Sequence, residues 1–587
     1  ITTDNADITL NGTNSVITSN STLIDATLTG IGAAGALRIL GGRIFARTNV
    51  FNNAGLLQAA NGGTIDLSGG ALGGLLSGTL GVGAYDIGTN AILQLASVQA
   101  ITTDNANIIL RGPGSAIKAG TTLIESSLTN IGTAGTLRIL DSRTYTTGNA
   151  IDESGTLVVD NDATMTVGGL TIEPTGTVFV GADSALNVGS PILSFGTLIN
   201  AGSITAGAGT AVAFGTNTNR LILGPTGLFS GTVVGGGVNS ILELSSGAGP
   251  GTLTSLGTSF VNFGSVVIGA GANWTVNTSS IAAGQTINAT KGTFNFTGGA
   301  GNDVVTVSGT SISGDTLVGG GGVNTLNLTP AGSFNLGGVK QFSQINLAPG
   351  DNTVTVTDNT LSGGPVTILA PPTGNTTINA AGAVASTGKT LTYTAPVANT
   401  GTSIFTGGSE NDVVNLGTGA VTKSTLIGGA GSNTLNLSNV GTFTLAGVKQ
   451  FGAIYLQAGN NTVTVTNNTL SGGTVAMRAG ATGSNVIDAS GANASGGRTL
   501  VYVAARITDT LKGPDIFTGG AEDDVISATA SRGERFGPGW RRRQQHAEPH
   551  VRRAFLSVGG VKQFNLIILA DGNNAVTVTN NTPSGEL

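Results

Sequence analysis

Residues 351–364 read DNTVTVTDNTLSGG. Val and Thr alternate within this stretch, so an extended chain places apolar side chains on one face and hydroxyl groups on the other. The flanking Asn residues and the Ser-Gly-Gly that follows tolerate the turn and left-handed conformations in which short strands end. The stretch therefore predicts a short β-strand that is buried on one face and enclosed by tight turns.

The same stretch occurs twice more, inside a long repeat. It reads NNTVTVTNNTLSGG at 460–473 and NNAVTVTNNTPSGE at 573–586. Each copy follows a GVKQF sequence, and these sequences recur with a period of 109 to 113 residues. They end at Phe342, Phe451 and Phe564. We therefore interpret residues 291–587 as three repeats of about 110 residues each.

A second family of repeats occupies the N-terminal part of the chain. Residues 1–40 recur at 101–140 with 24 of 40 positions identical, at a spacing of 100 residues. We interpret residues 1–200 as a segment with two 100-residue repeats. Residues 201–290 continue the Gly, Thr and Val pattern without a third long repeat.

Strands this short are not stable alone, because too little apolar surface is buried by one strand. Stacked coils bury a continuous apolar column and pair nearly every backbone group. We therefore expect an all-β fold, an elongated parallel β-solenoid (β-helix) built from short strands and Gly or Asn turns. The alternative is a tandem array of β-sandwich domains, each of about 100 residues.

The composition excludes several classes of function. The chain of 587 residues has 96 Gly and no Cys, and only 10% of its residues are charged. Disulfides, thiol catalysis and Cys-based metal sites are therefore excluded. The net charge of −6 offers no basic surface for nucleic acid. We see no signal peptide and no apolar run that could insert into a membrane, and we expect the chain to be a segment of a longer protein.

One nonapeptide carries a resemblance to a known family. Residues 298–306 read GGAGNDVVT, which fits the pattern GGxGxDxUx, where U is a large apolar residue. This stretch resembles the hemolysin-type, calcium-binding RTX repeats, in which Gly-rich turns and the Asp carboxylate hold calcium and U packs inside a parallel β-roll. Oxygen ligands on a tight turn suit a hard cation. The resemblance implies Asp303, Asp412, Asp523 and Asp524 as candidate calcium ligands.

Other copies of the nonapeptide depart from this pattern. Glu410 and Glu522 replace the fourth Gly in two copies, and Asn324 and Asn433 replace the Asp in two others. The copies also lie about 21 residues apart rather than nine. Two interpretations therefore remain. The motifs form either structural Gly turns that bind no ion, or calcium-binding sites.

Residues 533–554, GERFGPGWRRRQQHAEPHVRRA, differ from the rest of the chain and contain both His residues. In the other repeats, a step of 21 residues from Asp303 or Asp412 reaches the sequence NTLNL. One choice of synonymous codons for residues 542–550, read one base later, encodes GGNNTLNL. We interpret the segment as frameshifted, with a divergent loop as the alternative, and we assign no function to His546 or His550.

Candidates for catalysis are few. A glycosidase needs two carboxylates across a sugar. Asp160 and Asp162 would share a face of a strand, but they occur once, in a DND sequence that is typical of a turn. A β-helical polysaccharide-active enzyme or a carbohydrate-binding module is therefore only the alternative function. The aromatic residues are expected to pack in the core or at strand edges rather than to bind sugars, including Trp274, Tyr85, Tyr145, Tyr393, Tyr455 and Tyr502. The repeated Phe296, Phe405 and Phe517 are expected to fill the core.

The composition, rich in Gly, Thr and Asn, is similar to that of bacterial surface-layer proteins, autotransporter-like passengers and large adhesins. This resemblance implies a secreted, non-catalytic protein with a structural or adhesive role at the bacterial cell surface or in the extracellular matrix. The expected partners are further copies of the chain, assembled into filaments or a lattice, or surface glycans. Calcium is the one cofactor that the motifs suggest.

Overall fold

The computed structural model describes residues 2–279, 281, 284–289, 292–309, 312–384, 388–492, 498–503, 515–518, 523–527, 553–557 and 573–577. The frameshift prediction falls almost entirely outside the described residues. Only β64 (Arg553–Ser557), which pairs in parallel with β65 (Asn573–Thr577), touches the end of that segment. The frameshift therefore stays a prediction.

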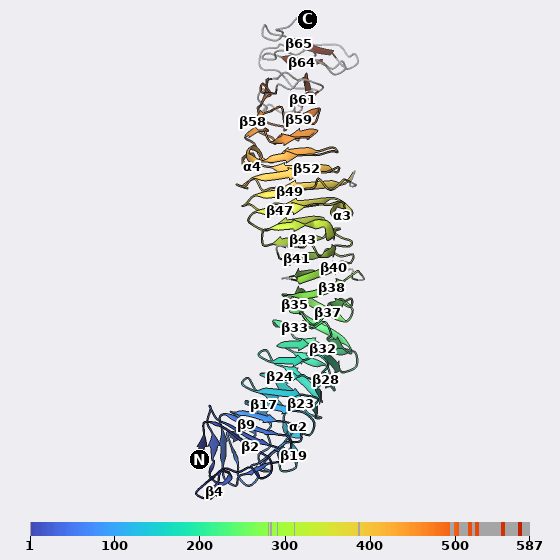
Figure 1. Cartoon of the computed structure of the whole chain (residues 1–587). Coiled ribbons are helices and arrows are strands. Elements are labelled where there is room, and N and C mark those ends of the chain that lie inside the picture. The colour runs from blue at the N-terminus through green and yellow to red at the C-terminus, as the bar shows by residue number, and fades with distance from the viewer. Residues whose placement is uncertain are drawn as a thin grey trace, which may run out of the picture. The chain divides into compact units, whose positions relative to one another are not determined.

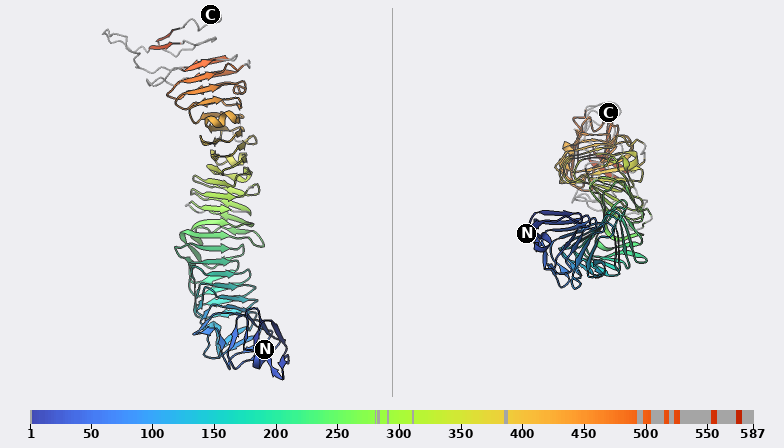
Figure 2. Two further views of the ribbon diagram at one scale, coloured as in Figure 1. Left: turned by 90° about the vertical axis from the view of Figure 1, so that its left-hand side faces the viewer. Right: turned by 60° about the horizontal axis from the view of Figure 1, so that its bottom comes forward.

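As far as the structure describes it, the chain is 49% strand and 4% helix, and its parallel coils stack into a β-solenoid of about 22 turns (Figures 1 and 2). The predicted all-β solenoid is confirmed, and the β-sandwich alternative is wrong. Strands of successive coils pair in parallel and in register, as Ile8, Leu37 and Leu57 do. The chain divides into an N-terminal unit (residues 1–281 and 285–296) and a C-terminal unit (282–284 and 297–587).

Each coil of the N-terminal unit contributes strands to up to three faces. The first face contains β2 (Asp7–Asn11), β6 (Ala36–Leu40), β9 (Leu56–Ala60), β14 (Ala84–Ile87), β17 (Asn107–Arg111), β21 (Thr136–Leu140), β24 (Thr156–Val159), β27 (Thr177–Val180), β30 (Thr197–Asn200), β33 (Asn219–Leu223), β35 (Thr232–Leu244), β37 (Phe260–Ile268) and β39 (Thr286–Ala289).

The second face of this unit holds two parallel sheets, β7 (Ile44–Ala46), β10 (Thr64–Asp66), β15 (Ile92–Leu95) and β18 (Ala116–Ala119), and then β22 (Thr144–Thr146), β25 (Thr164–Val167), β28 (Ala185–Val188), β31 (Ser203–Ala206) and β34 (Leu228–Phe229). The third face contains β1 (Thr3–Asp4), β5 (Gly30–Ile31), β8 (Phe51–Asn53) and β11 (Leu72–Gly73), and then β13 (Thr79–Leu80), β16 (Thr103–Asp104), β20 (Asn130–Ile131), β23 (Ala150–Glu153), β26 (Gly169–Ile172), β29 (Ile192–Ser194) and β32 (Thr210–Phe214).

The C-terminal unit is built in the same way. Its first face contains β41 (Val304–Ser308), β43 (Thr325–Thr329), β46 (Gln344–Leu347), β48 (Val366–Leu369), β50 (Thr390–Thr394), β52 (Asn411–Leu416), β54 (Thr434–Leu437), β57 (Ala453–Tyr455), β59 (Val475–Arg478), β61 (Thr499–Val503) and β63 (Asp523–Ser527). A second face contains β44 (Ser333–Asn335), β47 (Asn352–Thr355), β49 (Thr376–Asn379), β51 (Ser403–Thr406), β53 (Thr425–Ile427) and β56 (Val448–Lys449). The sheet of β55 (Thr442–Thr444), β58 (Asn461–Thr464), β60 (Asn485–Asp488) and β62 (Ile516–Thr518) follows.

The core of each unit is a set of apolar columns inside the coils. Val354 in β47 is fully buried and Thr353 beside it is exposed, which confirms the alternation predicted from VTVT. The predicted core positions of Phe296, Phe405 and Tyr393 are also confirmed, since each is at most 1% exposed, whereas Phe517 is only half-buried. Full burial of one such side chain contributes roughly 1.5–3 kcal/mol, so the stacked columns dominate the stability of each unit.

The long sequence repeats are groups of coils. The first face advances from β2 to β17 in four coils over 100 residues, and from β41 to β52 in five coils over 109 residues. One coil in each 100-residue copy carries an extra helical turn, α1 (Ile24–Thr27) or α2 (Ile124–Ser127). Because the coils within one copy differ in this way, the sequence repeats only after the whole group.

Candidate cation-binding turns

The four Gly-rich turns that the structure describes in the C-terminal unit lie in two stacked pairs. Turns 298–303 and 319–324 are on successive coils, and the Asp303 N–H donates to Asn324 Oδ1 at 2.8 Å. Turns 407–412 and 428–433 repeat this arrangement, with the Asp412 N–H and Asn433 Oδ1 2.9 Å apart. The 21-residue step seen in the sequence is therefore one coil, and each pair consists of an Asp turn and an Asn turn.

The Asn turns are closed by the amide itself. The Asn324 Nδ2 group donates to the carbonyl oxygens of Gly321 (2.8 Å) and Gln341 (3.1 Å). The Asn433 Nδ2 group donates in the same way to Ala430 (2.9 Å) and Gln450 (3.2 Å). Turn carbonyls that could face a cation are therefore satisfied by a neutral donor, and these two turns hold together without an ion.

In the Asp turns, carboxylate oxygens, which only accept hydrogen bonds when ionised, take the place of the Asn amide donor. Asp303 and Asp412 are 1% and 0% exposed, and Glu410 is also fully buried. All four carboxylate oxygens of Glu410 and Asp412 lack a hydrogen-bond partner. A buried carboxylate without a donor is costly in its charged form, so this pair needs a neutralising partner.

Oxygen atoms surround the Gly407–Gly408 peptide. A side chain at Gly408 would collide with Glu410 Oε2 and with the carbonyl oxygens of Ala380 and Ala383. A side chain at Gly407 would collide with Asp412 Oδ2 and the Gly428 carbonyl oxygen. The absence of side chains at these two glycines therefore makes room for five oxygen atoms from three coils.

Burial changes the protonation of this pair. It raises the pKa of Asp412 to about 9, and the charge of Glu410 adds to the effect. Burial also raises the pKa of Glu410. The N–H groups of Gly408 and Ser409 lie near the Glu410 carboxylate and oppose this rise in pKa, but they do not reach hydrogen-bond geometry.

The predicted ligands are not brought together. Asp303 and Asp412 lie five coils apart in the same unit. The backbone of Asp523 and Asp524 forms β63, and the side chains of both residues lie outside the described part of the chain. Among the described residues, no cluster of three or more His, Cys, Asp or Glu side chains occurs. Sequence reasoning treated Glu410 only as a departure from the motif, whereas it lies beside Asp412.

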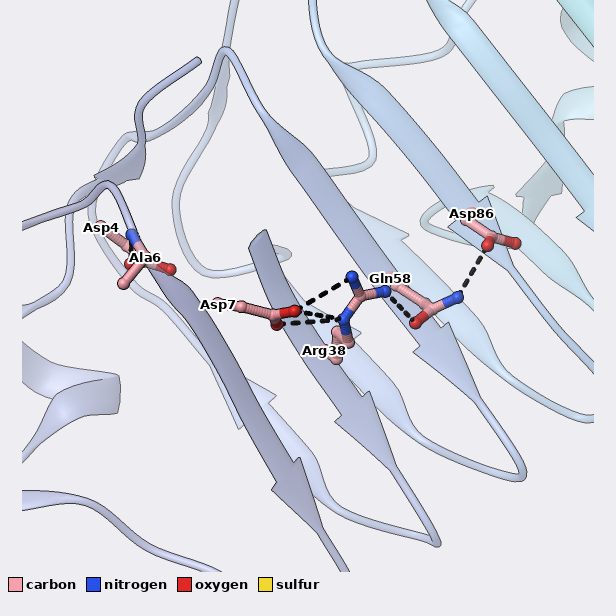
Figure 3. Close-up of polar contacts among 6 residues, drawn as sticks. All are labelled: Asp4, Ala6, Asp7, Arg38, Gln58 and Asp86. Atoms are coloured by element: carbon pink, nitrogen blue, oxygen red, sulfur yellow. Dashed lines mark hydrogen bonds and ion pairs between the residues drawn. The ribbon is translucent and has the colours of Figure 1, made fainter. Parts of the chain in front are cut away.

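A polar network crosses the outward side of the first face of the N-terminal unit (Figure 3). Arg38 binds Asp7 at 3.0 Å and donates to Gln58 Oε1 at 2.9 Å. Gln58 donates to Asp86 at 2.7 Å. Arg111 pairs with Asp86 at 2.8 Å. Because two acids alternate with two arginines, the network is closed and electrically balanced, and it offers no free acid or base.

Two acids of the N-terminal unit are enclosed in the interior of the third face. Asp104 and Glu153 are fully buried, and in the register Ile131 separates them. Burial raises the pKa of Asp104 to about 7 and that of Glu153 to about 8. Asp104 Oδ1 accepts a hydrogen bond from the Ala106 N–H at 2.8 Å, and Asp4 makes the same contact with Ala6 (Figure 3). These acids cannot reach a substrate.

The positions of the remaining catalytic and sugar-binding candidates in the fold show which of them are exposed and which share a strand face. Asn161 and Asp162 have φ values of 55° and 61°, so Asp160 and Asp162 lie in a turn, as the DND sequence indicates, and do not share a strand face. Tyr455 was expected in the core or at a strand edge, and it is 43% exposed, so it does not pack in the core. It lies 5.8 Å from the Arg478 guanidinium, because position 455 faces outward in β57.

The described part of the chain has no helix long and apolar enough to cross a membrane. Comparison with family models, curated proteins and solved structures finds no match to this chain.

Proposed function

We propose that the chain is a secreted structural and adhesive protein of the bacterial cell surface or extracellular matrix, without catalytic activity. The observation that carries this proposal is a set of side-chain ladders between coils on the outward side of the first face. In the C-terminal unit, Asn346 donates to Asn327 at 2.8 Å, and Asn327 donates to Thr306 at 3.2 Å.

A second ladder follows on the same face. Asn436 donates to Asn415 at 2.7 Å, and Asn415 donates to Thr394 at 2.8 Å. Each rung adds a side-chain contact to the backbone hydrogen bonds between coils, so the ladders oppose separation of the coils. Reinforced stacking of this kind suits a stiff spacer.

Negative-stain electron microscopy of the purified chain over a range of concentrations tests the structural role. We expect filaments or sheets to form as the concentration rises, because copies of the chain are the expected partner. Exclusively monomeric particles at high concentration would contradict self-assembly. Release of reducing ends from plant or bacterial polysaccharides would favour the alternative, a polysaccharide-active enzyme.

One exposed site favours glycans as the adhesion target. Tyr455, Asn436 and Arg478 follow one another in register across β54, β57 and β59. An exposed aromatic ring between an amide and a guanidinium offers stacking and hydrogen bonding, which suit a sugar. We expect Tyr455→Ala to reduce retention on a glycan array at least threefold. Equal retention of the variant and the parent chain would exclude this surface, and Tyr393→Phe serves as a buried control.

A further inference from the structure

An apolar strip runs along the outward side of the first face in the N-terminal unit. Each successive coil places one outward side chain in register with the last, and the inward residues between these positions, such as Val178, are fully buried. In coil order, the strip consists of Ile109, Arg138, Val158, Phe179, Ile199, Ile222, Glu243 and Val267. Its four central side chains are therefore contiguous, apolar and half-buried.

The same position in the C-terminal unit is mainly polar. It carries the Asn and Thr ladders described above, and its Leu369 has Asn346 and Thr394 as neighbours in register. A single apolar residue on a surface is common, whereas a contiguous apolar patch marks an interaction surface. The apolar strip is thus a property of the N-terminal unit and not of solenoid coils in general.

Opposite charges enclose the apolar centre of the strip. Arg138 and Glu243 lie at its two ends, each one coil beyond the four central residues. Arg220 pairs with Glu243, whereas Arg138 is exposed and has no ion-pair partner among the described residues. When the strip is read in the reverse direction, apolar residues again meet apolar residues, and each charge meets its opposite.

We propose that two copies of the chain pair through this strip, with their N-terminal units antiparallel. A twofold axis that runs along the strands, between the coils of β27 and β30, places Arg138 of each copy opposite Glu243 of the other. The same axis places the central apolar residues opposite one another, in the pairs Val158 with Ile222 and Phe179 with Ile199. Parallel pairing would instead place each charge opposite its own kind, so the charges select the antiparallel arrangement.

The area of the strip sets the expected strength of pairing. Eight coils span about 34 Å at about 4.8 Å per step, and strands of this length are about 15 Å long. The buried area is therefore about 500 Å² per copy, below the roughly 800 Å² of a standard interface, so pairing should be weak and dependent on concentration. The inference rests on the self-assembly proposed above and names its surface, and it is independent of glycan binding.

Cysteine cross-linking of the full chain tests the arrangement, because the chain has no Cys of its own. A mixture of Val158→Cys and Ile222→Cys chains should form a disulfide-linked dimer on mild oxidation. Each variant alone should link at least tenfold less, because antiparallel pairing keeps identical positions three coils apart. Efficient linking of Val158→Cys to itself would indicate parallel pairing and overturn the proposal, as would the absence of linking in the mixture.

Sedimentation equilibrium gives a second readout without cysteine. Arg138→Glu should raise the dissociation constant of the dimer at least tenfold, because the charge pair occurs twice in a twofold dimer. Phe179→Thr should also weaken pairing, since it removes the largest apolar side chain of the strip. Leu369→Thr is the matched control, because it removes an outward apolar residue from the same position of the C-terminal unit, and it should leave pairing unchanged.

Electron microscopy of the same variants separates this inference from the proposed structural role. Filaments that form equally well from the parent and Arg138→Glu chains would overturn the strip and leave the structural role intact. Dimers linked as expected but without filaments would support the strip and contradict assembly into filaments. A parent chain that stays monomeric at hundreds of micromolar would overturn the proposal and leave the strip to a partner of different chemistry.

Discussion

Both units bury acids at their turns, and the buried amides of the C-terminal unit show how a turn is closed by different chemistry. In the N-terminal unit, Asp104 and Glu153 are enclosed acids, and Asp104 Oδ2 and both Glu153 carboxylate oxygens lack a hydrogen-bond partner. In the C-terminal unit, Asn324 and Asn433 are enclosed amides that donate and accept at once. An amide closes a turn at every pH, whereas a buried carboxyl depends on a proton or a cation.

Removal of the Asn433 amide should have the largest effect. Asn433→Ala leaves the buried Asp412 N–H without its acceptor and the carbonyls of Ala430 and Gln450 without this donor. The expected cost is roughly 3–5 kcal/mol of local stability, because each orphaned group costs roughly 1–3 kcal/mol. Hydrogen exchange of the Asp412 amide measures it, and unchanged protection would show that the amide does not hold the turn.

Glu153 should make the N-terminal unit sensitive to pH. The folded pKa of about 8 lies above the ordinary value of 4.5, so the folded state holds its proton longer than the unfolded state. Stability should therefore fall as the pH rises from about 4.5 to about 8, with a slope of at most about 1.4 kcal/mol per pH unit. Urea denaturation at both ends of this range measures the loss.

Glu153→Gln should abolish most of that pH dependence, because the amide carries no charge to bury. Asp152→Asn is the matched control, since Asp152 is the exposed neighbour in β23. A variant at position 153 that lost stability with pH as steeply as the parent would assign the effect to another group.

Asp104 should show the same behaviour in a narrower range. Its folded pKa of about 7 exceeds the ordinary value of 3.8, so its contribution should be lost between about pH 4 and pH 7. We expect stability to fall by at most about 1.4 kcal/mol per pH unit in this range, and Asp104→Asn should remove this loss while keeping an acceptor for the Ala106 N–H. A direct carboxyl titration by NMR checks the pKa, and a value near 4 would contradict this prediction.

Breaking an outward ladder should have the smallest effect. Asn436→Ala removes one contact with Asn415 on a half-buried face, where water can replace the lost partner. The expected cost is below about 1 kcal/mol. A cost equal to that of Asn433→Ala, measured by the same exchange experiment, would show that the outward ladders contribute as much as the buried amides do.

The sequence predicted the architecture through local rules. Alternation in VTVT determined which side chains point inward, and Phe296 and Phe405 were correctly expected in the core. The length of a single coil was harder to predict from the sequence. Coils within one repeat differ in the segments between their strands, as the extra helical turn α1 shows. The exposed position of Tyr455 was missed because a short strand with the sequence AIY does not indicate its register.

What the sequence determined by itself was the strand, the turn and their repetition, because alternation and glycine conformation act over a few neighbouring residues. What only the tertiary structure decided was the environment of Glu410. Its burial beside Asp412 depends on Ala380 and Ala383, about thirty residues earlier in the chain but on the adjacent coil. Contacts between coils set the protonation of the acids in that turn, and no local pattern encodes them.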